Sequence, residues 1–581
     1  MGTGFAIDTP LRVARYGISS VISAVDDLLI EQMREYHSEL ENEPYEEIPA
    51  SGDDPRARRI TEYLNLLDRL LDRQVEALQA SPFEPGSEIT RYYEMLPEGK
   101  LKDTYRQMLA CTDAERKATL QQQLRESAIP GGIDVNIMSK GVRELYRDGE
   151  KMPTEFNDAM AALRGFANST VSSSIVFSAG MNPRLYGYVA QFDDFFPDDE
   201  GRLKKKIVLK VSDYRSAVIQ GKFFAKRGLW VSEYRIESGL NCGGHAFATK
   251  GLLMGPILEQ FKQNRESLVK QLHALYIKAL AARDRCPVEM PHEMRVTVQG
   301  GIGTAEEDDF LREYYEVDAT GWATPFMLVP EATNVDDEHL KKLMEADDDE
   351  VYLSDSSPFG MPFWNLRNSA SENSRRGRIE SGKPGSPCCK GHVSFNSEFT
   401  EIPLCTASRN YQRRKLEHLA EEGLTEEQIA RVEEHVLAKS CICNDLAGGA
   451  LIKFGIDTKA TPAVCCGPNI VNFSKIATLE EMIGHIYGRL SLLTNDSRPH
   501  MFIRELALYA EYLRDEISWY ATGLLPRPPE YFSEFRENLL EGIEYYRHMV
   551  EHLDEDSRRP FVEGLNEIQK AVELLAPPVA V

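Results

Sequence analysis

The most regular feature of the chain is a series of short runs in which β-branched and apolar residues alternate with polar ones. Such alternation predicts half-buried β-strands, and several of the stretches between the runs have the apolar spacing of helices. Eight strand-like units with helical connections predict an α/β fold, a parallel sheet closed into a (β/α)8 TIM barrel. A doubly wound open sheet alternates in the same way and stays open as the alternative. The eight runs cover residues 5–7, 18–23, 133–138, 173–178, 205–211, 229–236, 294–299 and 318–324.

The pattern changes after the second run, where charged and apolar residues recur at helical spacing. An apolar stripe from Ile60 to Val75 predicts a helix that packs by one face. A later stretch is rich in Gly, Pro, Ser and Asp, and helical spacing returns towards the C-terminus. The predicted parts are a barrel at 1–25 and 129–335, a helical insertion at 26–128, a loop-rich cysteine region at 336–469 and a mostly helical region at 470–581.

Composition narrows the class of protein. The 581 residues are 42% hydrophobic and 27% charged, as in soluble globular proteins. The net charge is −25, from 67 basic and 92 acidic side chains, and so acidic a surface disfavours nucleic acid as a partner. The chain shows no secretory signal and no run of about 18 apolar residues, so we expect a cytoplasmic protein without a membrane span.

Three glycine-bearing junctions follow predicted strands, where a barrel places its chemistry. Residues 300–304 (GGIGT) and 321–326 (GWATPF) end two neighbouring runs, and backbone N–H groups at such turns suit a phosphate dianion. Residues 237–247 end in a Gly-Gly-His sequence, in which His245 could titrate near neutral pH. A histidine in a turn can equally be held by a backbone carbonyl, and this alternative stays open.

The order of these motifs resembles a known family. The segments IDVNIM, SIVFSAG, IVLKVSD, GLNCGGH, VTVQGGIGT and GWATPFMLVPEA are similar to those of the nitronate monooxygenase (2-nitropropane dioxygenase-like) family of FMN-dependent barrels. Barrel-type enoyl-thioester reductases are relatives of that family. The resemblance covers roughly residues 4–332, interrupted by the helical insertion.

The resemblance implies a flavin site at the carboxyl ends of the strands. His245 would be the catalytic acid or base, and Asn136 and Lys210 would lie near the isoalloxazine ring. The turns after the last strands would hold the FMN phosphate. The full set of implied cofactor-binding residues is Asn136, Lys210, Ser238, Gly243, Gly244, Gly300, Gly301, Gly303, Thr304, Ala323 and Thr324.

The chain also departs from the family pattern. Ala323 and Pro325 replace a glycine and an arginine of the last motif, so the phosphate cup is expected to be built differently. Cys242 replaces an alanine before Gly-Gly-His, and Ser238 stands where a flavin-contacting glutamine is usual. FMN binding is therefore expected, whereas the substrate specificity of the family is not.

Seven of the ten cysteines are crowded between residues 388 and 466. Outside the secretory pathway such crowding disfavours a disulfide framework, and the absence of a CxxC pair disfavours zinc ribbons and ferredoxin-like runs. Thiolates from four separate loops could surround an iron–sulfur cluster of the 4Fe-4S type. Zinc, redox-active thiols and thiols that act only as small hydrophobic groups stay open. The predicted ligand set is Cys388, Cys405, Cys443 and Cys465.

Three functional hypotheses follow. The first is an FMN-dependent oxidoreductase, assisted by an iron–sulfur cluster, that reduces or oxidises a small unsaturated or carbonyl compound. Its reductant would be NAD(P)H or an electron-donor protein, and self-association into a homo-oligomer is left open. The second is a nitronate monooxygenase that oxidises alkyl nitronates. The third is a non-catalytic scaffold on a flavin-barrel fold.

Overall fold

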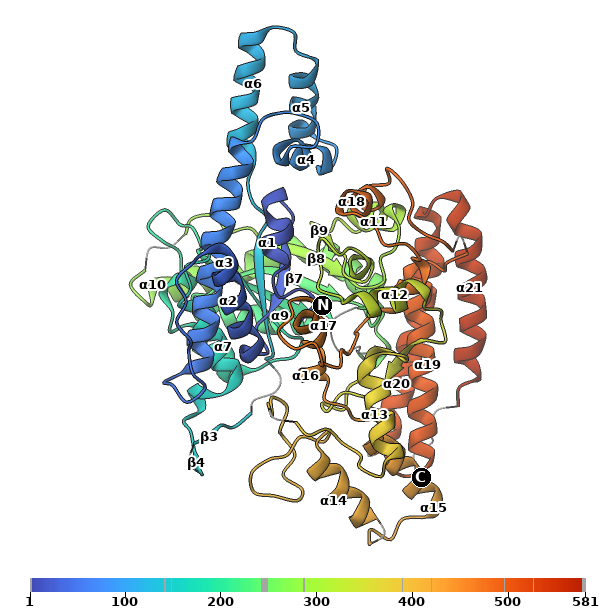
Figure 1. Cartoon of the computed structure of the whole chain (residues 1–581). Helices are drawn as coiled ribbons and strands as arrows, with labels where there is room; N and C mark the ends of the chain where they lie inside the picture. The colour runs from blue at the N-terminus through green and yellow to red at the C-terminus, as the bar shows by residue number, and fades with distance from the viewer. Residues whose placement is uncertain are drawn as a thin grey trace.

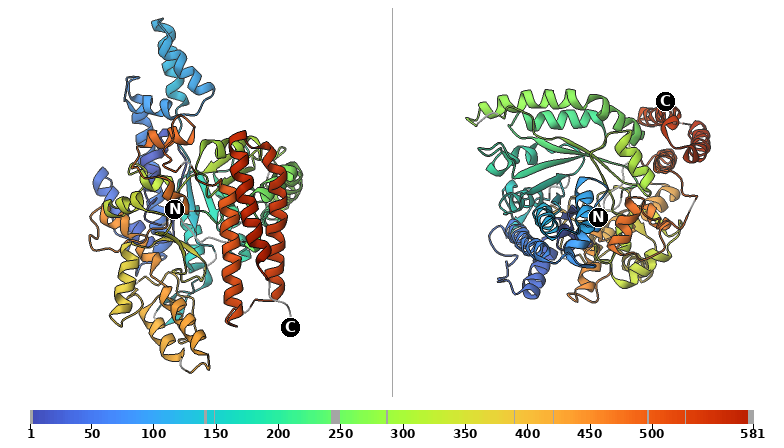
Figure 2. Two further views of the ribbon diagram at one scale, coloured as in Figure 1. Left: turned by 90° about the vertical axis from the view of Figure 1, so that its right-hand side faces the viewer. Right: turned by 90° about the horizontal axis from the view of Figure 1, so that it is seen from above.

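The computed structural model describes residues 3–139, 143–147, 149–241, 249–285, 288–388, 390–419, 421–495, 497–525 and 527–576. Its centre is a parallel sheet of seven strands that curls into a half-barrel (Figures 1 and 2). The strands lie side by side in chain order, and each neighbouring pair is parallel. They are β1 (Ser20–Ser23), β2 (Ile133–Ile137), β5 (Ser173–Phe177), β6 (Lys205–Val211), β7 (Val231–Glu237), β8 (Arg295–Gln299) and β9 (Ala319–Gly321).

The described residues do not form the closed eight-stranded barrel that the sequence predicts. β1 and β9 are the two edges of the sheet, and the predicted strand at residues 5–7 is a buried turn. The Gly4 N–H donates to the Leu446 carbonyl (3.1 Å), and the Asn334 N–H donates to the Phe5 carbonyl (2.9 Å). Three apolar residues cannot distinguish a strand from a buried turn, and here contacts with the C-terminal half decide the conformation.

The strands alternate as their sequences predict. In β2, Ile133, Val135 and Ile137 are buried, whereas the intervening Asp134 and Asn136 are on the concave side of the half-barrel. One helix follows each strand from β2 to β8 and covers the convex side. These helices are α7 (Asp158–Ala167), α8 (Pro183–Val189), α9 (Tyr214–Ala225), α10 (Met254–Ala281) and α11 (Ala305–Glu313).

The helical insertion after β1 consists of two parts. The first part, α2 (Asp27–Glu41) and α3 (Pro55–Ala80), packs beside α7 and belongs to the main hydrophobic core. The second part projects from the body of the molecule (Figure 1) and shares a smaller core with α18 (Leu479–Ile486). It comprises α4 (Glu88–Met95), α5 (Lys100–Ala110) and α6 (Ala114–Ser127).

The C-terminal half begins with a loop-rich region and ends in long helices. α19, α20 and α21 pack together, and α20 packs against α10 (Figure 2). Two short antiparallel pairs and a first helix complete the fold. The remaining elements are α1 (Thr9–Val13), β3 (Tyr146–Arg147), β4 (Glu150–Lys151), α12 (Asp337–Glu345), β10 (Val351–Ser354), β11 (Phe363–Leu366), α13 (Ala370–Glu380), α14 (Arg409–Leu419), α15 (Glu426–Ala438), α16 (Ile442–Asp445), α17 (Gly448–Lys453), α19 (Met501–Ala521), α20 (Pro529–Met549) and α21 (Glu555–Leu574).

The hydrophobic cores do not divide along the predicted domain boundaries. One core joins side chains of the sheet, of α2 and α3 in the insertion, and of α19, α20 and α21. The sheet and the last helices therefore bury their apolar surface against each other. In the part of the chain that the structure describes, no helix has the length and apolar character needed to cross a membrane.

Candidate functional site

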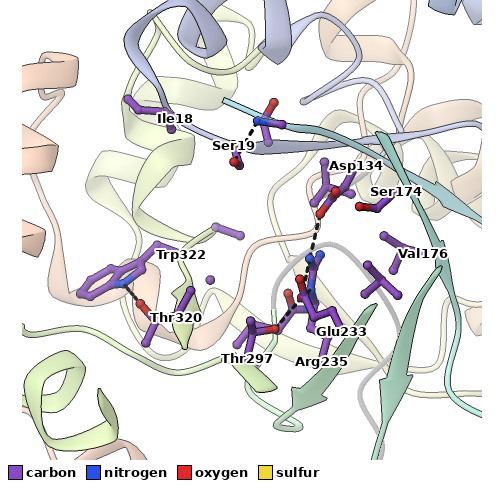
Figure 3. A pocket seen from close by; sticks show the side chains of 18 of the residues that line it. Ile18, Ser19, Asp134, Ser174, Val176, Glu233, Arg235, Thr297, Thr320 and Trp322 are labelled. Carbon is purple, nitrogen blue, oxygen red and sulfur yellow. Dashed lines mark hydrogen bonds and ion pairs between the residues drawn. The ribbon is translucent and has the colours of Figure 1, made fainter. Parts of the chain in front are cut away.

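The concave face of the half-barrel encloses a cavity of about 910 Å³. In each strand, every second side chain points away from the outer helices. These side chains therefore form the wall of the cavity. TIM barrels usually fill this space with branched apolar side chains, whereas here most of the inward side chains are polar (Figure 3). They include Asp134, Asn136, Lys206, Lys210, Glu233, Arg235, Glu237, Thr297 and Gln299.

An ion network lies within the wall of this cavity. Arg235 bridges two carboxylates, with one guanidinium nitrogen 2.8 Å from Asp134 and another 2.7 Å from Glu233 (Figure 3). The Thr297 hydroxyl also donates to Glu233 (2.6 Å). Burial alone would lower the pKa of Arg235, but the two carboxylates raise it above its usual value. Arg235 therefore stays charged between the two carboxylates and stabilises them in the wall of the cavity.

A second polar group lies at the carboxyl edge of the sheet, around Glu237 at the end of β7. The Lys210 ammonium is 3.4 Å from one carboxylate oxygen of Glu237. The side-chain amides of Asn241 and Gln299 both donate to the other oxygen. On β2, three strands away from β7 in the sheet, the Asn136 amide donates to the Ser23 hydroxyl (3.1 Å). Asn136 and Lys210, both predicted flavin contacts, thus line the same cavity.

The glycine turn after β8 reaches the cavity only with its first residues. Gly300 and Gly301 line the cavity and adopt positive φ angles of 104° and 84°, which favour glycine. Gly303 lies behind them, and its N–H donates to the Glu307 carboxylate (2.8 Å). Thr304 caps α11 by accepting from the Glu307 N–H (3.1 Å). The structure therefore does not bring Gly303 and Thr304 to the cavity wall.

A buried ion pair holds this turn from behind. One guanidinium nitrogen of Arg498 is 2.7 Å from Glu307, and both side chains are only 4% exposed. A second nitrogen of Arg498 donates to the Gly301 carbonyl (2.6 Å), and a third donates to the Asn469 side chain (2.8 Å). Burial would raise the pKa of Glu307, but Arg498 holds it below the usual value. The C-terminal half of the chain thus positions the turn.

The turn after β9 meets the same cavity. Ala323 and Thr324, both predicted phosphate contacts, line it together with Trp322. The Trp322 indole N–H donates to the Thr320 hydroxyl (3.2 Å), which orients the ring at the edge of the sheet (Figure 3). The two predicted phosphate turns, after β8 and β9, therefore share one cavity.

Ser238, a further predicted flavin contact, is buried behind the cavity wall. Its hydroxyl hydrogen-bonds to Glu505 of α19 and accepts from the Leu240 N–H (3.2 Å). Glu505 also accepts from the Met254 N–H (2.8 Å). Burial raises the pKa of Glu505 to about 7. Ser238 and Met254 flank the Gly-Gly-His motif in the sequence, so Glu505 connects the two ends of that segment.

The Glu505→Gln substitution is expected to remove a pH dependence of stability between about pH 4.5 and about pH 7. In this range the folded state keeps the proton on Glu505 and the unfolded state has released it, so wild-type stability decreases as the pH rises. A shift of this size corresponds to about 3 kcal/mol. Denaturant unfolding at both ends of the range should show a smaller decrease for the variant. Equal decreases in both proteins would contradict a buried, protonated Glu505.

Part of the predicted site lies outside the described residues. This part comprises the catalytic candidate His245 and the preceding Cys242, Gly243 and Gly244. Their predicted roles stay predictions.

The structure brings together three of the four predicted cysteine ligands. Cys405 and Cys443 belong to one small buried cluster and Cys388 packs against it, whereas Cys465 is buried in a different core. Cys441 joins the first three. Among the described residues, no three His, Cys, Asp or Glu side chains are already arranged around a metal position.

Two residues of the carboxyl edge, Glu237 and Gln299, are absent from the predicted site. Their sequence signal is the strict alternation along β7 and β8, which puts Glu237 on the same side as Glu233 and Arg235. Comparison with known proteins adds nothing to this geometry, since no protein-family model and no curated protein matches the chain. The resemblance to the nitronate monooxygenase family stays a prediction.

Proposed function

We propose that the protein is an FMN-dependent oxidoreductase that binds its flavin in the concave cavity and acts on a small unsaturated or carbonyl compound. The observation that carries this proposal is the convergence of predicted flavin contacts from four strands or strand ends on one cavity. Its volume of about 910 Å³ suits a cofactor together with a substrate, because ligand pockets typically span about 300–1,000 Å³. The converging residues are Asn136, Lys210, Gly300, Gly301, Ala323 and Thr324.

The fit of a phosphate depends on backbone donors that are not used by any residue in the described part of the chain. Gly301 and Ile302 line the cavity, and no acceptor for their backbone N–H groups is found among the described residues. These two amides and Thr324, which lines the same cavity, are the proposed phosphate contacts. Ile302 takes the place of Gly303 as a proposed phosphate contact, because the Gly303 N–H already donates to Glu307.

The carboxyl edge suits the ring of the cofactor. The Lys210 ammonium would stabilise negative charge on the reduced flavin, and Glu237 would hold that ammonium in place. When bound, FMN would supply hydride and single-electron transfer. His245 is proposed as the acid or base that exchanges a proton with the substrate. NAD(P)H or an electron-donor protein is the proposed reductant.

The first test is the cofactor content of the full-length protein. Purified protein is expected to be yellow and to release about one FMN per chain on denaturation, measured by absorbance and chromatography. Lys210→Met should weaken FMN binding about tenfold, or ~1.4 kcal/mol, whereas Lys206→Met should not. Lys206 is the matched control because it lines the same cavity from the same strand, further from the carboxyl edge.

A colourless protein that does not bind added FMN would contradict the proposal and favour the scaffold hypothesis. Aerobic oxidation of alkyl nitronates by the flavoprotein would identify a nitronate monooxygenase. Reduction of an enone or a related carbonyl compound at the expense of NAD(P)H would support the proposed substrate class.

A further inference from the structure

Four thiols gather outside the cavity, in the loop-rich region of the C-terminal half. Cys405, Cys441 and Cys443 are buried in one small cluster, and the half-buried Cys388 packs against it. None of the four forms a disulfide. They come from three segments that are well separated in the sequence, so the fold itself assembles the group.

The loops that carry Cys388 and Cys405 run side by side. The Ser386 N–H donates to the Ala407 carbonyl (2.9 Å), and the Arg409 N–H donates back to the Ser386 carbonyl (3.0 Å). Among the described residues between α13 and α14, only single β-bridges occur and no helix or strand. Loops with so little regular structure and so small an apolar core commonly need a disulfide or a metal ion to hold them together.

Backbone donors are directed at two of the sulfurs in the same way. Cys388 accepts from the N–H groups of Lys390 and Gly391, the latter at 3.4 Å. Cys405 accepts from those of Ala407 and Ser408. Each sulfur thus receives the amides two and three positions further along the chain. A neutral thiol is a weak acceptor, whereas paired amides stabilise the thiolate, which is the form that binds metals.

The thiols also contact one another. Cys441 packs in one cluster with Cys405 and Cys443, and Cys388 packs against that cluster. Four thiolates around a zinc ion at ~2.3 Å lie about 3.8 Å apart, which is within the range of side chains in packing contact. The four ligands of a 4Fe-4S cluster each bind a different iron, so their sulfurs stand further apart than four ligands of one zinc ion. These contacts favour a single metal ion over a cluster.

The described side chains do not yet form a coordination shell. In the absence of a metal ion, the neighbouring Cys441 raises the pKa of Cys388, and burial raises the pKa of Cys405 to about 12. Metal binding would release the thiol protons to solvent and rotate the sulfurs towards one centre, without any transfer of electrons.

We propose that Cys388, Cys405, Cys441 and Cys443 bind one zinc ion as a four-thiolate structural site. The set differs from the sequence-based prediction in Cys441, which takes the place of Cys465, and in the metal. The proposal does not depend on flavin binding.

The site is connected to the sheet. Lys390 and His392 both approach the Asp26 carboxylate, at 2.6 and 3.4 Å, and Asp26 caps α2 directly after β1. Met138, which follows β2, packs against the thiol cluster. Zinc would therefore fix the loops beside the carboxyl ends of β1 and β2, next to Asn136 of the cavity wall.

Metal content is the first test. Full-length protein purified without added metal is expected to contain about one zinc per chain and no acid-labile sulfide. Replacement of zinc by Co²⁺ should give the absorption bands of tetrahedral cobalt thiolate, a readout that needs no substitution. Iron accompanied by sulfide would overturn the proposal, and so would failure of the reduced protein to bind either Zn²⁺ or Co²⁺.

Variants test the ligand set. Cys441→Ser should abolish stoichiometric zinc binding, whereas Cys465→Ala and Cys111→Ser should retain it; Cys111 is a remote control on the insertion. Loss of zinc in Cys465→Ala with retention in Cys441→Ser would overturn the assignment. If Cys441→Ser does not fold, zinc should still protect Cys441 of the wild type from alkylation, and protection of Cys465 in its place would refute the set. Lys210→Met should keep its zinc whatever its flavin content.

Discussion

Replacement of Arg235 by leucine is expected to lower the free energy of unfolding by about 3–5 kcal/mol. Arg235 bridges Asp134 and Glu233, and the three side chains are between 9% and 17% exposed. The substitution leaves two carboxylates close together inside the sheet without their counter-charge. Desolvation and mutual repulsion of the carboxylates then act in the same direction, and both destabilise the folded state. Urea unfolding at neutral pH measures the loss of stability.

The control for this prediction is Arg202→Leu. Arg202 also pairs with two carboxylates, those of Asp198 and Glu200, but its side chain is 73% exposed. A pair in contact with water contributes little, so this variant should unfold like the wild type. Acidic pH should restore part of the stability of Arg235→Leu, since protonation removes the repulsion. A loss in Arg235→Leu no larger than that in the control would contradict the buried network.

Arg498→Leu is also expected to lower the free energy of unfolding by about 3–5 kcal/mol, and in addition to weaken flavin binding. The substitution leaves Glu307 as a buried charge without its partner and removes the donor to the Gly301 carbonyl. The turn that carries the proposed phosphate contacts would lose its support, although Arg498 is not among the residues that line the cavity. Urea unfolding and FMN titration measure the two effects.

Arg514→Leu is the matched control, because Arg514 lies on α19 with a 62% exposed side chain and forms only surface ion pairs. It should change neither stability nor FMN affinity. A stable Arg498→Leu variant with wild-type FMN affinity would show that the ion pair does not position the turn.

Much of the sheet could be predicted because apolar and polar residues alternate along its strands. Seven of the eight predicted runs overlap strands, and residues such as Asp134 and Asn136 fall on the side that the alternation assigns to them. Closure of the barrel could not be predicted. Closure depended on residues 5–7, whose conformation is set by hydrogen bonds involving Leu446 and Asn334. These two residues are far away in the sequence, so the local pattern of residues 5–7 does not reveal the contacts.

The candidate site was predictable where a strand or a strand end carries the residue. Asn136, Lys210 and Gly301 reach the cavity because parallel strands end at a common edge. Gly303 does not, because its amide is taken by Glu307, one turn further along the chain. The spacing of the cysteines likewise could not show whether Cys441 or Cys465 joins the thiol cluster, because only tertiary packing determines which loops meet.

The interlocking of the two halves has a consequence for biosynthesis. A turn near residue 4 is completed by a carbonyl of Leu446, and the sheet packs on α19, α20 and α21, which are synthesised well after it. During translation the apolar surface of the half-barrel is therefore exposed to solvent until these helices have been synthesised. Nascent chains with exposed apolar surface tend to aggregate or to bind chaperones. Any truncation before α19 should yield insoluble protein, even if every strand of the sheet is present.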